Sequence, residues 1–172
     1  YPLFSYAALL SWTLFAEGIN RSTNSLIQNS NLITKVYFPR LIMPISGIIS
    51  PLVDFVFAFI VFLGMMFYFG FIPTIRIFLL PLFLILALMA ALAVGFWLSA
   101  LNVRYRDVPY AVPFLIQIWF FASPVVYSST ALPKSWQLIY SLNPMVGVIE
   151  GFRWVLLGGK PPGEFMVISI II

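Results

Sequence analysis

The chain has no cysteine, no histidine and very few charged residues. Of its 172 residues, nine are Lys or Arg and five are Asp or Glu, so that 8% are charged. Average soluble domains carry about 25% charged residues. A chain that is 62% hydrophobic and 18% aromatic has too little polar surface to cover a water-soluble protein of this length. The composition therefore predicts an integral membrane protein.

These absences also exclude several functions. Without cysteine there is no disulfide framework and no thiolate metal site. Without histidine the chain lacks the commonest general base and the commonest metal ligand. No G-x-x-x-x-G-K-[ST] phosphate loop occurs, so the chain does not hydrolyse ATP by that mechanism. The net charge of +4 is small and is typical of loop orientation and lipid contact, and we expect no nucleic-acid partner.

Four apolar runs approach the length of about 20 residues that a helix needs to cross a bilayer. They cover residues 2–19, 41–69, 77–101 and 108–128, and a fifth run starts at about residue 164 and stops with the chain. Backbone groups in lipid must be paired within the protein, which favours a polytopic helical bundle. The chain starts without Met and without the pattern of a signal peptide. We expect it to be a fragment of a longer protein.

Between the fourth and fifth runs, apolar patches are broken by Pro133, by Asn143 and Pro144, and by Gly158 and Gly159. This pattern predicts two short re-entrant helices within about 133–158, the second starting at Pro144 and ending at the glycines. Glu150 and Arg153 are three residues apart on that second helix, a spacing that allows a local ion pair.

Lys and Arg are unevenly distributed between the two sets of loops. Loops 20–40 and 102–107 hold five of them, whereas the longer loops 70–76 and 129–163 hold four. Because cytoplasmic loops carry the excess of basic residues, the first set is predicted to be cytoplasmic. The cytoplasmic set is Arg21, Lys35, Arg40, Arg104 and Arg106.

The cytoplasmic segment 31–40, "NLITKVYFPR", has the pattern of a short amphipathic helix. Its apolar positions recur at i, i+1, i+4 and i+5, namely Leu32, Ile33, Val36 and Tyr37. Ser30 or Asn31 can cap its start, and Pro39 disfavours helix at the residue before it. The segment either docks on a partner or lies on the membrane surface, where Lys35 and Arg40 meet anionic lipid.

Three motifs resemble one protein family. "NLITKVYFPRLIMPIS" with "LVDF" after it, "LNVRYRDVPYAVPFLIQIWFFASPVVYS" and "LNPMVGVIEGFRWVLLGG" are similar, in that order, to the membrane subunit of type-2 ABC transporters that export polysaccharide such as O-antigen, capsule or teichoic acid. The resemblance implies six spans preceded by an amphipathic helix, of which this chain lacks that helix, the first span and most of the last. It also implies a homodimer in the bacterial inner membrane.

The resemblance further implies that segment 31–40 is a coupling helix docked on a separate ABC ATPase subunit, which binds ATP and magnesium, so that this chain needs no cofactor of its own. The expected contacts to the ATPase are Leu32, Ile33, Lys35, Val36, Tyr37, Phe38 and Arg40, with Arg104 and Arg106 from the second cytoplasmic loop. Those two arginines equally suit a solvated anchor at the membrane surface. The re-entrant helices would shape an extracytoplasmic gate that includes Trp136, Asn143, Pro144, Glu150 and Arg153.

Aromatic side chains can stack on the apolar faces of sugar rings, so some of the 18 Phe, 8 Tyr and 5 Trp are candidates for lining a polysaccharide channel. The alternative is contact with lipid or with the membrane interface. The resemblance places the first and fourth runs along the channel, and the candidates there are Trp12, Phe15, Trp119, Phe120 and Tyr127.

Ionisable residues inside spans are costly and indicate function. Asp54 in "PLVDFVF" is expected to face the bundle interior, either bonded to a neighbouring helix or near the channel. Glu17 lies near the end of its run and can reach the interface. Nothing in the sequence brings Glu17 and Asp54 together as an acid–base pair of the kind that a membrane glycosyltransferase would use.

The sequence thus predicts an all-α permease subunit that exports a lipid-linked polysaccharide, most simply O-antigen carried on undecaprenyl pyrophosphate. The alternatives are a type-2 exporter of drugs or lipids and, from another class, a membrane-embedded glycan-handling enzyme.

Overall fold

The computed structural model describes residues 2–30, 39, 41–71, 74–105, 107–125 and 142–158. All regular structure in these residues is helical, which confirms the all-α class for this part of the chain. The elements are α1 (Pro2–Gln28), α3 (Ile42–Ile49), α4 (Pro51–Tyr68), the 3-10 helix η1 (Ile75–Leu79), α5 (Leu80–Arg104), α6 (Val108–Phe121) and α8 (Pro144–Leu157).

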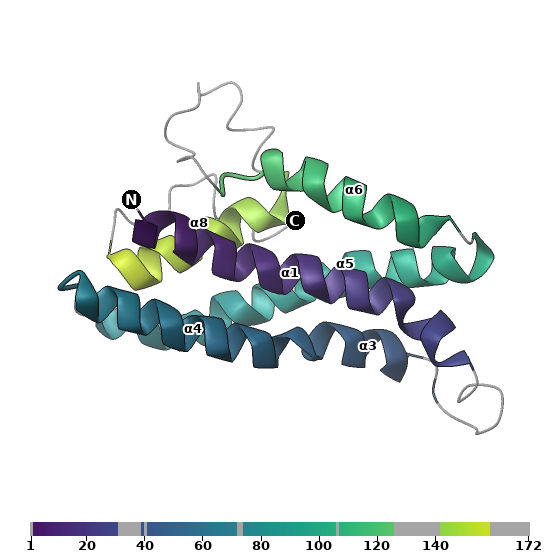
Figure 1. The fold of residues 1–172 in the computed structure, drawn as a ribbon, viewed down its shortest axis with the longest axis horizontal. Coiled ribbons are helices and arrows are strands. Elements are labelled where there is room, and N and C mark those ends of the chain that lie inside the picture. The colour runs from purple at the N-terminus through teal and green to yellow at the C-terminus, as the bar shows by residue number, and fades with distance from the viewer. Residues whose placement is uncertain are drawn as a thin grey trace.

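Helix α1 forms the centre of the bundle and contacts α3, α4, α5, α6 and α8. In Figure 1, α3 and α4 run along one side of α1, α6 runs along the other, and α5 lies behind it. The end of α1, the start of α3, the end of α5 and the start of α6 lie at one end of the bundle, with α8 at the other. This arrangement agrees with the alternation of loops predicted from the sequence.

Two helical segments among the described residues are long and apolar enough to cross a membrane: Ile42–Tyr68 and Ile75–Arg104. The first, 27 residues in length, is α3 followed by α4, with an interruption at Ser50. Pro51 has no N–H to donate to the preceding turn, so the helix restarts there with proline at its first position. Helix α6 is apolar but has 14 residues, or about 21 Å of length.

The first apolar run, 2–19, lies within a longer helix, because α1 continues to Gln28. Several residues after Ile19 are polar, and two of their hydroxyl groups bond within the helix. The hydroxyl of Thr23 donates to the carbonyl of Ile19 at 2.7 Å, and that of Ser25 to the carbonyl of Ser22 at 2.6 Å. Thr23 and Ser25 are buried, and such back-bonding lets hydroxyl residues enter a packed helix. Ser22 is buried as well, and its hydroxyl has no hydrogen-bond partner among the described residues.

The third and fourth predicted runs also change at their ends. Helix α5 begins at Leu80, after η1, and extends through Arg104, three residues beyond the predicted limit of 101. Helix α6 ends at Phe121, seven residues before the predicted limit of 128, and residues 122–125 form turns. Arg104 is therefore in the last turn of α5, where a cation is favoured by the helix dipole.

Small residues allow α1, α3 and α5 to approach closely. A Cβ added at Gly47 would lie 2.8 Å from the backbone nitrogen of Ser22, and one added at Gly95 would lie 2.8 Å from the hydroxyl oxygen of Ser22. Asn102 of α5 donates to the carbonyl of Thr23 at 2.7 Å in the same region. Close contact through small residues and interhelical hydrogen bonds is the usual way that helices associate in lipid.

Candidate functional site

Most of the predicted coupling segment lies outside the described residues. This holds for Leu32, Ile33, Lys35, Val36, Tyr37, Phe38 and Arg40, and also for Arg106. The structure does fix what the segment connects, because Gln28 ends α1 and Ile42 begins α3 at the same end of the bundle. Arg104 lies at that end as well, exposed, with its guanidinium 5.6 Å from the ring centre of Tyr105.

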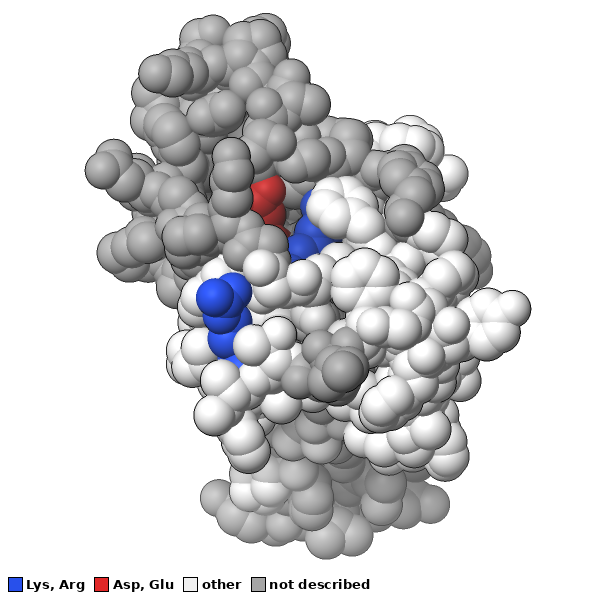
Figure 2. Space-filling view, turned by 90° about the vertical axis from the view of Figure 1, so that its left-hand side faces the viewer, with Lys and Arg blue, Asp and Glu red and all other residues white. Residues whose placement is uncertain are grey.

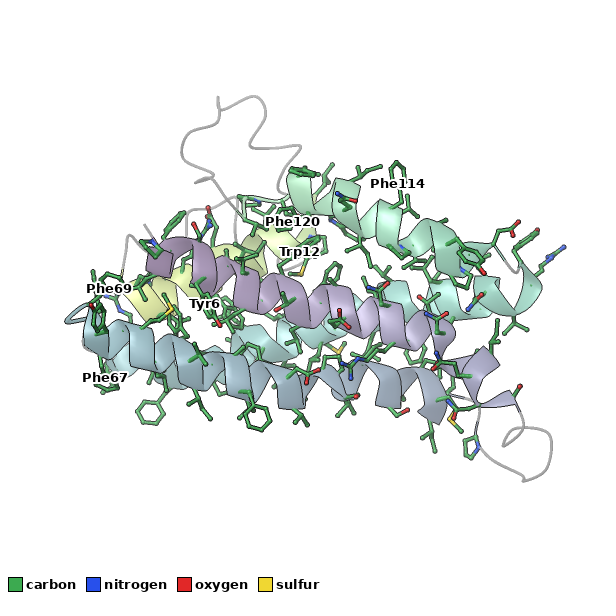
Figure 3. The ribbon with its side chains drawn as sticks, viewed as in Figure 1. Tyr6, Trp12, Phe67, Phe69, Phe114 and Phe120 are labelled. Atoms are coloured by element: carbon green, nitrogen blue, oxygen red, sulfur yellow. The ribbon has the colours of Figure 1, made fainter. Side chains whose placement is uncertain are left out.

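Four of the candidate channel aromatics pack on one another between α1 and α6. The rings of Trp12 and Phe120 are 5.6 Å apart, those of Phe15 and Trp119 are 5.2 Å apart, and both pairs meet edge to face. Figure 3 shows Trp12 and Phe120 between the two helices, whereas Phe67 and Phe114 project away from the bundle. Such aromatic pairs favour packing by about 0.5–1.5 kcal/mol beyond burial.

The burial of this cluster corrects the expectation for its two members on α1. Trp12 is 5% exposed and Phe15 is fully buried, so they are core residues of the protomer and have almost no surface to offer to a passing chain. Trp119 and Phe120 are partly buried. Trp119 also lines an apolar groove of 370 Å³ between α5 and α6, with Ile19 among the other lining residues. Tyr127 lies outside the described residues.

Asp54 is not in the bundle interior as predicted but on its surface, where 63% of its side chain is exposed. Its Oδ2 accepts a hydrogen bond of 2.7 Å from Nη2 of Arg21 on α1. Nη1 of Arg21 donates to the hydroxyl of Ser50 at 2.8 Å, at the interruption between α3 and α4. Nε of Arg21 lies 3.6 Å from Oε2 of Glu17. We call Glu17, Arg21, Ser50 and Asp54 the Arg21 network.

The start and end of α8 coincide with the signals predicted from the sequence. Asn143 caps the helix, its Oδ1 accepting from the backbone N–H of Met145 at 3.0 Å, and Pro144 is the first helical residue. The side-chain amide of Asn143 also donates to the hydroxyl of Ser123 at 2.9 Å, which ties α8 to the turns after α6. Gly158 ends the helix with a left-handed backbone, φ +69°, a conformation that glycine adopts without strain.

Arg153 of α8 is a buried cation that holds three parts of the chain together. It is 6% exposed, and its guanidinium donates to the carbonyls of Pro124 and Val125 at 2.7 and 2.6 Å and to that of Phe4 at 3.3 Å. It also stacks 3.6 Å from the ring centre of Phe4. Arg153 thereby joins α8, the start of α1 and the turns after α6.

The other predicted gate residues are only partly covered by the described residues. Glu150 lies partly buried on α8, and its pairing with Arg153 stays a prediction, while Trp136 lies outside the described residues. Figure 2 shows this end of the bundle, where an acidic patch lies beside a basic one and a second basic patch lies apart from them.

Sequence reasoning missed Arg21 as a site residue, because it assigned that arginine to a loop. A usable signal was present, since Glu17 and Arg21 are four residues apart, the spacing of an ion pair on one helix. The proximity of Glu17 to Asp54 through a shared guanidinium was equally unforeseen, because it depends on how α1 packs on α4.

Comparison with known protein families identifies the family of the chain. Residues 3–157 match the family described as ABC-2 type transporter, a match that covers nearly the whole chain. The chain belongs to this family. Membership of the ABC-2 type transporter family agrees with the two segments that are long and apolar enough to cross a membrane.

Three similar proteins carry the same description, "O-antigen export system permease protein RfbA". The one from Myxococcus xanthus is 29% identical over 164 residues, which cover 94% of this chain. Two from Klebsiella pneumoniae are each 27% identical over 99% and 98% of the chain. The chain spans 63–66% of the length of these curated relatives.

Proposed function

We propose that this ABC-2 family chain belongs to an exporter that moves lipid-linked polysaccharide, O-antigen in particular, across the inner membrane. The observation that carries the proposal is the similarity to O-antigen export permeases along 94–99% of the chain. A helical bundle with membrane-capable segments, and without the sequence motif of an ATP-hydrolysing loop, suits a permease that is driven by another subunit.

In the proposed assembly, two copies of the permease pair with two ATPase subunits, and the glycan passes between the copies. Segment 31–40 connects α1 with α3, so an ATPase bound to it would act on both helices together. An ATP-driven movement of that segment would then be transmitted as a shift of packed helices, a common form of switching in proteins.

The substrate is tested with the full-length permease and its ATPase in lipid nanodiscs. ATP hydrolysis is measured with undecaprenyl-linked polysaccharide, with undecaprenyl phosphate alone and with a panel of small lipids and drugs. The proposal expects the turnover rate to change with the polysaccharide and not with the other compounds. A response to small lipids or drugs without a response to polysaccharide would instead support a type-2 exporter of small molecules and refute the substrate.

The coupling segment is tested with the double variant Tyr37→Ala, Arg40→Glu, which removes an apolar anchor and reverses a charge. Loss of ATPase binding in a pull-down assay is expected. The matched control is Tyr68→Ala, which truncates an 86% exposed tyrosine at the end of α4, far along the chain from the segment. Normal ATPase binding by the double variant would leave segment 31–40 as a lipid-facing anchor.

A further inference from the structure

The Arg21 network lies halfway along a segment that is long enough to cross the membrane. Asp54 is 12 residues after the start and 14 residues before the end of Ile42–Tyr68, so it sits near the middle of a helix of about 40 Å. Arg21 and Glu17 are at the same level, because they are bonded to Asp54 directly or through one another.

Within the part of the chain that the structure describes, the network is exposed at that level rather than enclosed by the bundle. The exposed fractions of the side chains are 41% for Arg21, 53% for Glu17 and 63% for Asp54. Charged side chains in the centre of a bilayer face a protein interior or a water-filled cavity and do not face lipid. The surface that carries them is therefore not a lipid-facing surface.

The adjoining surface of α1 carries polar side chains as well, at every exposed position of the stripe except Leu9. From Leu9 to Arg21 the exposed positions of α1 fall four residues apart, at Leu9, Thr13, Glu17 and Arg21, and so form one stripe along the helix. By contrast, the exposed positions of α5 between residues 82 and 100 are all apolar: Leu82, Ile85, Met89, Ala93, Trp97 and Ala100. Exposed polar side chains therefore recur along this stripe of α1, at Thr13, Glu17 and Arg21, and do not occur in that range of α5.

A hollow adjoins the network between α1 and α4. Its volume is 150 Å³, and Thr13, Glu17 and Asp54 are among the residues that line it. Apolar residues complete its lining, Leu14, Phe55 and Ala58 among them.

We propose that the Arg21 network and the polar stripe of α1 line the aqueous path of the exporter at mid-membrane depth, where they bind hydroxyl groups of the passing glycan. This inference rests on the proposed function for the identity of the ligand. Carboxylates accept hydrogen bonds from sugar hydroxyls, and Glu17, Arg21 and Asp54 together carry one net negative charge, which disfavours a phosphate. A tightly packed contact with a second copy fits less well, because the cores of protein interfaces are depleted of Asp and Glu.

The absence of native cysteine allows a direct test by thiol labelling of the full-length permease. Thr13→Cys places a thiol in the stripe at little structural cost, since the threonine hydroxyl bonds only to the carbonyls of Leu9 and Leu10 on its own helix. The matched control is Val56→Cys, 53% exposed and two residues from Asp54, which places it on the opposite side of α4 at similar depth. Gel filtration verifies that both variants fold.

The labelling is carried out in nanodiscs with the ATPase bound, using a charged, membrane-impermeant thiol reagent. Thr13→Cys is expected to be labelled at least about tenfold faster than Val56→Cys, because the reactive thiolate and the charged reagent are both disfavoured in lipid. Equal rates at the two positions, or protection of Thr13→Cys in every state of the ATP cycle, would overturn the aqueous assignment.

The ligand is tested by repeating the labelling with undecaprenyl-linked polysaccharide and ATP. A several-fold slower labelling of Thr13→Cys, with Val56→Cys unchanged, supports contact with the glycan. If the polysaccharide stimulates ATP hydrolysis but leaves labelling unchanged, the glycan contact is refuted while the proposed function stands. If small lipids slow the labelling and polysaccharide does not, the aqueous path stands and the proposed substrate is refuted.

Discussion

The contact between α1 and α3 at Gly47 leads to a prediction whose size follows from the structure. A Cβ at Gly47 would lie 2.8 Å from the nitrogen of Ser22 and 2.9 Å from the carbonyl carbon of Arg21, both backbone atoms. Ordinary carbon contacts lie at about 3.5–4.0 Å, so Gly47→Ala forces the two helices apart by about 0.6–1.2 Å. Overpacking of this kind costs about 1–3 kcal/mol.

The matched control is Gly64→Ala on α4, because a Cβ at Gly64 meets no atom within 4 Å. Both substitutions gain the same helix propensity, about 1 kcal/mol, so that this contribution cancels in the comparison. Gly47→Ala is therefore expected to be less stable than Gly64→Ala by about 1–3 kcal/mol. For chains of this size the difference corresponds to about 2–12 °C in melting temperature.

The assay is thermal unfolding of the two purified full-length variants in the same detergent. The detergent is held constant because it sets the reference state of a membrane protein. Equal melting temperatures would refute the reasoning, since they would mean that α1 and α3 can separate freely at this point.

Three further predictions concern the aromatic cluster and α8. Phe15→Ala is expected to destabilise the permease by about 3–5 kcal/mol, whereas Phe57→Ala, at an exposed position, is expected to change the stability by no more than about 0.5 kcal/mol. Thermal unfolding measures both variants, and equal effects would contradict the burial of Phe15. Asn143→Ala removes the cap of α8 and is expected to cost about 0.5–2 kcal/mol, with Asn143→Asp, which keeps the capping oxygen, losing less. Arg153→Lys is expected to be destabilising, because an ammonium cannot reproduce the planar fork that reaches three carbonyls; a lysine variant as stable as the native protein would show that charge alone suffices.

The features that sequence predicted well rest on local signals. The ends of α8 follow from Asn143, Pro144 and Gly158, whose roles as cap, first helical residue and left-handed terminus depend on the backbone next to them. The segment Ile42–Tyr68 follows from a continuous apolar run. Neither conclusion needs knowledge of what these helices pack against.

The features that sequence missed depend on packing between distant parts of the chain. Phe15 and an exposed phenylalanine such as Phe57 are chemically identical, and only packing against other helices, with Trp119 of α6 among the contacts, decides that Phe15 is buried. Arg21 follows an apolar run and has the composition of a loop residue. Its role becomes visible only when α4 brings Ser50 and Asp54 within 2.8 Å and 2.7 Å of its guanidinium.

The position of α1 explains why the centre of a membrane-capable bundle is more polar than the helices around it. A helix contacted by α3, α4, α5, α6 and α8 needs small residues to let its neighbours approach, and serine and threonine meet that need while bonding to their own helix. Its neighbours shield it from lipid on most sides, which permits these hydroxyl groups. The uncovered side carries Glu17 and Arg21, residues that lipid would not tolerate. The length of an apolar run therefore identifies the helices that contact lipid. It gives too short a length for α1, the helix that contacts the other helices and, on our proposal, the substrate.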